Sequence, residues 1–122
     1  MSSLKQRLLK SRNKVIKTLE IDGAPVDLCR PNNPERLAVF DAARAAGEID
    51  EGRQPTSEQA GLRLLARVVA TVMRDPETGE RVFDPASTED IDAICAAPWF
   101  DDVPDAAMKA MHPSMEEVQG NS

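Results

Sequence analysis

Aromatic residues are scarce in this sequence of 122 residues, which has three phenylalanines, one tryptophan and no tyrosine. A hydrophobic core must therefore be built mainly from leucine, valine, isoleucine, alanine and methionine. Hydrophobic residues still make up 41% of the chain and charged residues 30%, which is the balance of a folded globular protein. The length fits one small domain.

Long apolar runs and a cysteine framework are also missing. No run approaches the ~18 residues that a membrane-spanning helix needs. Residues 1–19 are basic but lack the apolar segment of a secretory signal, so we expect no such signal. Cys29 and Cys95 are too few for a disulfide scaffold or a complete zinc site. These features favour a reducing cytoplasm.

Groups that serve catalysis, metals or phosphates are few. The one histidine, His112, is expected near a helix end, where a lone histidine is most often solvated. Cys29 and Cys95 are better explained as small buried apolar residues than as nucleophiles. No glycine-rich phosphate motif occurs. An EF-hand loop starting at Asp75 would need glutamate at its twelfth position, which is Ala86. We therefore expect no enzyme, no metal and no cofactor.

Charge is segregated along the chain, whose formal net charge is −6. Residues 1–19 carry six bases and no acid, whereas residues 75–105 carry ten acids against Arg81 alone. One interpretation is self-complementarity, within one molecule or between copies in an oligomer. The other is a nucleic-acid-binding arm. We favour the first, because the arm has no aromatic residue to stack on a base and the net charge repels phosphate.

The first expected element is a short amphipathic helix over residues 3–12. Ser2 or Ser3 can cap it. A helix of about three turns is marginal alone, so it needs packing to persist. Three leucines form its apolar face: Leu4, Leu8 and Leu9.

A β-hairpin should follow this helix. Alternation over residues 14–21 predicts a strand with Val15, Lys17, Leu19 and Ile21 on one side. The following Asp-Gly pair is a strong turn signal.

Two hairpin registers are possible. A two-residue loop sets Lys17 opposite Leu28. A four-residue loop over residues 22–25 pairs Leu19 with Leu28 and keeps Pro25 out of the ladder. We prefer the four-residue loop, because apolar register usually outweighs the exposed like-charge pair that it creates.

Helices are expected over most of the remaining chain. Asn33 should cap a helix that ends at Gly47, before a mobile polar loop over residues 47–55. Thr56 and Gln59 form a capping box for the longest helix, whose broad leucine and valine face predicts the central core helix.

Turn residues divide the second half. Pro76 and Gly79 predict a tight turn with a short extended arm to Phe83. Ser87 caps another helix that Pro98 ends, and Pro104 lies near the start of the last helix.

The predicted fold class is α+β, mainly α, as a small helical domain with one N-terminal β-hairpin. We expect a single domain over residues 1–112 and a flexible polar tail over residues 113–122.

One cluster could bind a partner. Trp99 and Phe100 lie together at an expected helix joint beside acidic residues, and Met108 and Met111 follow nearby. A core role is the simpler explanation. The alternative is a partner-binding patch of Trp99, Phe100, Met108 and Met111, because methionines adapt to varied partners.

The order of elements carries a resemblance to a known family. A basic helix leads into a hairpin, a helix opened by Asn33-Pro34-Glu35-Arg36, and a long leucine and valine helix. The stretch from Val72 to Ile94 then runs from "VMRDPETGERVF" into the acidic "STEDIDAICAAP" helix. Over roughly residues 3–112 this pattern resembles the tail assembly chaperones of long-tailed bacteriophages and their prophage relatives.

The resemblance implies a non-enzymatic protein. Such chaperones bind and solubilise the tape measure protein, recruit tail tube subunits in the host bacterial cytoplasm, and are not expected in the mature virion. Some members of the family self-associate, so the resemblance also allows a homo-oligomer. The alternatives are a small prophage regulator that uses the basic helix on nucleic acid, and a structural head-tail or tail component. No membrane partner is expected.

Overall fold

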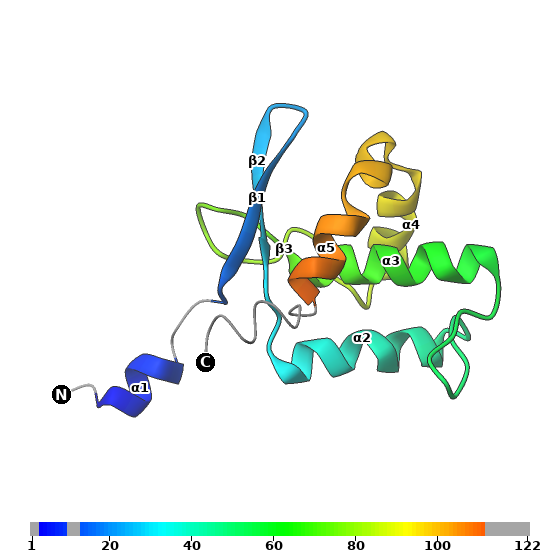
Figure 1. The fold of residues 1–122 in the computed structure, drawn as a ribbon, viewed down its shortest axis with the longest axis horizontal. Helices are drawn as coiled ribbons and strands as arrows, with labels where there is room; N and C mark the ends of the chain where they lie inside the picture. The colour runs from blue at the N-terminus through cyan, green and yellow to red at the C-terminus, as the bar shows by residue number, and fades with distance from the viewer. Residues whose placement is uncertain (1–2, 10–12, 112–122) are drawn as a thin grey trace.

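The longest helix, α3 (Glu58–Val72), is the centre of the molecule (Figure 1). The computed structural model describes residues 3–9 and 13–111. The other elements in that part of the chain are α1 (Leu4–Leu9), β1 (Val15–Ile21), β2 (Ala24–Cys29), α2 (Asn33–Ala45), β3 (Met73–Arg74), α4 (Thr88–Ala96), the 3-10 helix η1 (Pro98–Asp102) and α5 (Pro104–Met111). The mainly α, α+β fold class is confirmed.

Helix α3 packs against α2, α4 and α5, and β3 extends directly from its end. Every residue from Ala66 to Val72 is buried, so the second half of α3 is surrounded on all sides. The predicted role as the central core helix is therefore correct. The helix begins one residue later than predicted: Ser57, not Thr56, is the N-cap, and its Oγ accepts the amide of Ala60 at 3.0 Å.

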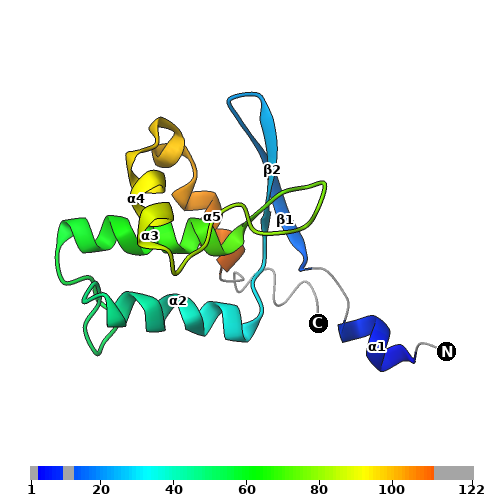
Figure 2. The same ribbon diagram turned by 180° about the vertical axis from the view of Figure 1, so that it is seen from behind.

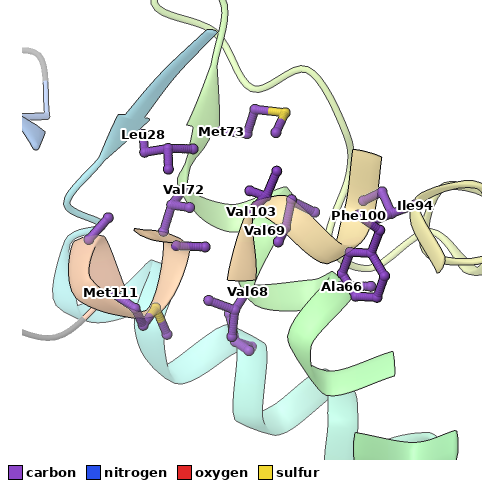
Figure 3. Packing of buried hydrophobic residues seen from close by; sticks show 14 of the residues in the cluster. Leu28, Ala66, Val68, Val69, Val72, Met73, Ile94, Phe100, Val103 and Met111 are labelled. Carbon is purple, nitrogen blue, oxygen red and sulfur yellow. The ribbon is translucent and has the colours of Figure 1, made fainter. Parts of the chain in front are cut away.

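The core joins the sheet to the helices (Figure 3). Leu28 of β2 and Met73 of β3 face α3 and α5 across this core. Phe100 is the one aromatic residue among its buried members. Its fully buried larger side chains are aliphatic or methionine: Leu28, Val39, Val69, Val72, Met73, Ile91, Ile94, Val103 and Met111.

The hairpin uses the two-residue loop, so the predicted four-residue loop is wrong. Asp22 and Gly23 have φ values of 51° and 82°, the left-handed pair of a type I′ turn. Lys17 does lie opposite Leu28, and Pro25 lies in the ladder opposite Glu20. The proline is tolerated because the pair next to the closing pair of such a hairpin is not hydrogen-bonded.

A β-bulge between Val15 and Lys17 explains how the register can still bury apolar residues. The bulge turns Ile16 inward beside Leu19 and Ile21, which pack on the core. Val15 and Lys17 are exposed, so the predicted single face of alternating residues is wrong before Leu19.

The α2–α3 connection is more ordered than predicted. Asn32, not Asn33, caps α2 and forms a capping box with Glu35. Gly47, just after the end of α2, has a φ of 75°, the left-handed conformation that was expected there. The following loop buries Glu48 and Ile49, and an Ile49–Pro55 bridge closes it. The polar composition of this loop gives no indication of these buried residues or of the bridge.

The remaining turns follow the predictions. Gly79 has φ 74°, and the Ser87 hydroxyl accepts the amide of Asp90 at the start of α4. Pro98 begins η1 where α4 has ended, and Pro104 begins α5. The short strand β3, which pairs with β2 through Asp27 and Leu28, was not predicted.

Helix α1 lies apart from the body in both views (Figures 1 and 2). It forms part of the helix predicted over residues 3–12, of which residues 10–12 lie outside the described chain, and it buries none of its residues. The Ser3 hydroxyl accepts the amide of Gln6 at 3.2 Å, which confirms Ser3 as a cap. The predicted tail over residues 113–122 lies outside the described residues.

Candidate functional site: an apolar groove between two helices

An apolar hollow on the described surface runs between α2 and α3, with a volume of about 360 Å³. We call it the α2–α3 groove. The helices lie side by side and antiparallel, joined by the loop at one end (Figure 2). Its lining is apolar apart from one glutamate: Phe40, Pro55, Glu58, Gly61, Leu62, Leu64, Leu65, Val68 and Met108.

The groove exists because the first half of α3 has more apolar surface than its neighbours cover. Leu62 is 51% exposed and Met108 of α5 is 38% exposed, while Leu64 and Leu65 are half-buried. The Arg53 guanidinium lies 4.4 Å from the centre of the Phe40 ring at the groove's edge. Such an apolar channel can take a complementary apolar helix.

The four residues predicted as a partner-binding patch do not form one surface. Phe100 is 5% exposed and Met111 is fully buried, so both belong to the core. Trp99 is half-buried and stacks on Phe83, with ring centres 6.2 Å apart. Of the four, Met108 alone lines the groove. Met108 and Met111 therefore do not share an exposed face, because α5 turns Met111 into the core.

The cysteines fit the expectation of small packed residues. Cys29 is buried and Cys95 half-buried, and burial raises the pKa of both thiols. His112 lies outside the described residues. Within residues 3–9 and 13–111, no three His, Cys, Asp or Glu side chains are placed to hold a metal ion.

A buried ion network ties the loop to α3. Arg67 donates two hydrogen bonds to Glu48, at 2.7 and 2.8 Å, and a third to the Pro85 carbonyl at 2.8 Å. Arg63 donates to Glu48 at 3.3 Å and also pairs with Asp92 of α4. These bonds pair the buried charges of Glu48 and Arg67 with each other, so we assign the network a structural role.

A second anchor lies where the N-terminal segment joins the body. Glu35 accepts from the Asn32 amide at 3.0 Å and from Asn13 Nδ2 at 2.9 Å, and it pairs with Arg74 of β3. Asn13 Nδ2 also donates to the Arg30 carbonyl at 2.9 Å. Glu35 therefore fastens α2, the sheet and the base of the N-terminal segment at one point.

Both anchoring glutamates are held ionised. Burial raises the pKa of Glu48, but hydrogen bonds and positive charge from Arg67 and Arg63 outweigh it, and the pKa lies below its ordinary value. Burial also raises the pKa of Glu35. The hydrogen bonds from Asn32 and Asn13 and the positive charge of Arg74 outweigh burial, so the pKa of Glu35 lies below its ordinary value.

The protein should therefore lose stability in acid. A carboxyl whose pKa is lowered by folding stabilises the fold fully above its unfolded value of about 4.3, and that contribution disappears as the pH falls towards the folded value. We expect the urea midpoint to hold above about pH 6 and to fall from about pH 4.5 downward. Glu48→Gln should make this fall shallower, whereas Glu51→Gln, in the same loop but exposed, should leave it unchanged. An equally steep fall in both variants would contradict the assignment to Glu48.

Comparison with protein-family models, with curated proteins and with solved structures finds no significant match for this chain. Across the described part of the chain, no helix has the length and apolar character needed to cross a membrane.

Sequence reasoning missed most of the groove. Leu62 and Leu65 belong to the leucine and valine face that the sequence predicts as core, and nothing in the sequence singles out Phe40 as surface. The broad apolar face of α3 predicts a core helix, and it does not show that Leu62, near the start of the helix, is 51% exposed.

Proposed function

We propose that this chain is a tail assembly chaperone of a long-tailed bacteriophage or prophage. It acts without catalysis in the host bacterial cytoplasm, holds apolar helical segments of the tape measure protein, and recruits tail tube subunits. The observation that carries the proposal is the α2–α3 groove, an apolar channel with Leu62 and Met108 exposed on its lining.

The physical argument is that a long helical protein exposes an apolar stripe until it is assembled. A stripe of residues spaced three and four apart can lie in an apolar groove, which removes it from water and prevents aggregation. The α2–α3 groove offers aliphatic and aromatic side chains for this contact, with Glu58 as the charged residue among those that line it. The order of elements described above, from basic helix to acidic helix, supports the same family.

The test is co-expression with the tape-measure-like product encoded beside this gene, followed by pull-down from the soluble fraction. We expect the partner to become soluble and to co-purify. Leu62→Lys should reduce capture at least about tenfold, since it places a charge in the apolar contact. Val82→Lys is the matched control, because Val82 is 47% exposed and does not line the groove.

Leu62→Lys should fold normally, because lysine four residues after Glu58 suits an exposed helix position. A partner that stays insoluble and unbound with the wild-type chain would contradict the proposal, and DNA binding and virion content would then test the two alternatives. Equal capture by Leu62→Lys and wild type would remove the groove from the mechanism. Loss of capture in Trp99→Ala alone, with the fold intact, would move the contact to the Trp99–Phe83 pair.

A further inference from the structure

Helix α1 has an apolar face that no element of the described chain covers. Leu4, Leu8 and Leu9 are 70%, 63% and 76% exposed. A six-residue helix gains little stability from its own hydrogen bonds, so contact with an apolar surface is what would hold it. Three exposed leucines on one short segment therefore indicate a docking element.

The charge around these leucines is matched by the rest of the chain. Residues 1–19 carry six bases and no acid, so the remaining residues carry a net charge of −12. The α2–α3 groove has Glu58 at its lining and no lysine or arginine among its lining residues. The match between α1 and that groove is mainly apolar, because Glu58 is its one charged lining residue and Arg53 lies beside Phe40 at its edge.

The other hollow beside the sheet fits α1 less well. It has a volume of about 340 Å³ and lies between β1 and α5. Ile16, Leu19 and Ala106 supply apolar surface there, but the rest of its lining is charged: Lys17, Asp102, Asp105 and Lys109. Three leucines packed there would remove these charged groups from water, which is unfavourable.

The position of α1 favours a groove on another molecule. Asn13, held by the Arg30 carbonyl and by Glu35, fixes the base of the N-terminal segment beside the first turn of α2. The groove lies towards the opposite end of that helix, where Pro55 and Gly61 line it close to the loop. In Figures 1 and 2, α1 points away from the body at the end remote from this loop.

We propose that α1 of one copy binds the α2–α3 groove of a second copy, and that two chains exchange α1 reciprocally. Leu4, Leu8 and Leu9 enter the apolar channel, and Lys5 lies near Glu58. The exchanged helix occupies the surface assigned above to a client, but self-association does not depend on any client. Dimer formation and client capture then compete for one groove.

The first measurement is the molar mass of the full chain in solution as its concentration is raised. We expect the wild type to move from one chain towards two. The L4Q/L8Q/L9Q variant should stay at one chain, or dimerise at least about tenfold more weakly. At a concentration where the wild type is monomeric, its thermal unfolding curve should match that of the wild type, because α1 buries none of its residues within one chain. Leu62→Lys should also stay at one chain, and Val82→Lys should dimerise as the wild type does.

A mixing experiment tests the exchange itself. The L4Q/L8Q/L9Q variant keeps an intact groove, and Leu62→Lys keeps an intact α1. Neither dimerises alone, but an equimolar mixture should form a heterodimer through the one intact pair, and a synthetic peptide of residues 1–14 should dissociate it.

Four results would overturn the inference: a wild type that remains monomeric at every concentration, a dimer that survives in L4Q/L8Q/L9Q, a dimer that survives in Leu62→Lys, or a mixture of the two variants that does not associate. The proposed function is tested separately. Loss of dimerisation with client capture retained in L4Q/L8Q/L9Q supports both proposals. A dimer that survives Leu62→Lys while capture is lost leaves only the proposed function standing.

Discussion

Arg67→Met should lower the free energy of unfolding by about 3–5 kcal/mol, whereas Arg44→Met should lower it by less than about 1 kcal/mol. Both variants remove one arginine charge from a helix. The Arg67 side chain is 4% exposed and makes two hydrogen bonds to Glu48, whose side chain is 5% exposed. Arg44 and Asp41 form a 3.8 Å pair with side chains 48% and 76% exposed.

The large effect follows from what the substitution leaves behind. Without Arg67, Glu48 keeps a buried charge with only the 3.3 Å contact to Arg63, and the Pro85 carbonyl loses its donor. Urea unfolding followed by the fluorescence of Trp99 gives the free energies. Replacing Glu48 by methionine as well should restore much of the loss, because the orphaned charge is then absent. Equal costs for Arg67→Met and Arg44→Met would contradict the buried network.

Leu28→Ala should cost about 2–5 kcal/mol of stability, the usual range for deleting a fully buried leucine side chain. Leu28 is completely buried, lies opposite Met73 in the sheet and faces the helices (Figure 3). The substitution removes its contacts and leaves a cavity that the flanking strands cannot fill. Leu37→Ala on α2 is the matched control, because Leu37 is 54% exposed, and it should cost less than about 1 kcal/mol.

Thermal and urea unfolding of both alanine variants provide the check. Similar costs at the two positions would mean that the junction between sheet and helices is loosely packed. An unchanged slope of free energy against urea in Leu28→Ala would show that the same surface is exposed on unfolding, so the difference belongs to the folded core.

Local chemistry explains the elements that sequence predicted well. Gly47 and Gly79 adopt positive φ, Ser87 caps α4, and Pro98 and Pro104 mark helix boundaries. Each depends on neighbours within a few residues, which the sequence displays directly.

Errors arose where two adjacent residues could perform the same local task. Asn32 and Asn33 can both cap α2, but Asn32 places Glu35 at the third helical position, where it returns a hydrogen bond. Thr56 and Ser57 can both cap α3, but the Thr56 hydroxyl is bound to the Gly47 carbonyl at 2.8 Å. A partner in the folded loop decides the second case.

Non-local contacts account for the remaining failures. The hairpin register depends on the bulge near Val15, and the order of the loop depends on Glu48 meeting Arg63 and Arg67 from the next helix. The groove consists of apolar surface of α3 that its neighbours leave uncovered, so its existence depends on how far α2 and α5 reach along α3. No short sequence window contains that information.

The bulge in β1 has one more consequence. In the sheet order β1-β2-β3, β1 is an edge strand, and its outer backbone groups could template pairing with a strand of any unfolded chain. The irregular register between Val15 and Lys17 breaks the flat ladder that such pairing needs, and the exposed lysine beside it adds a charge. The same device that buries Ile16 therefore protects the sheet against amyloid-like growth.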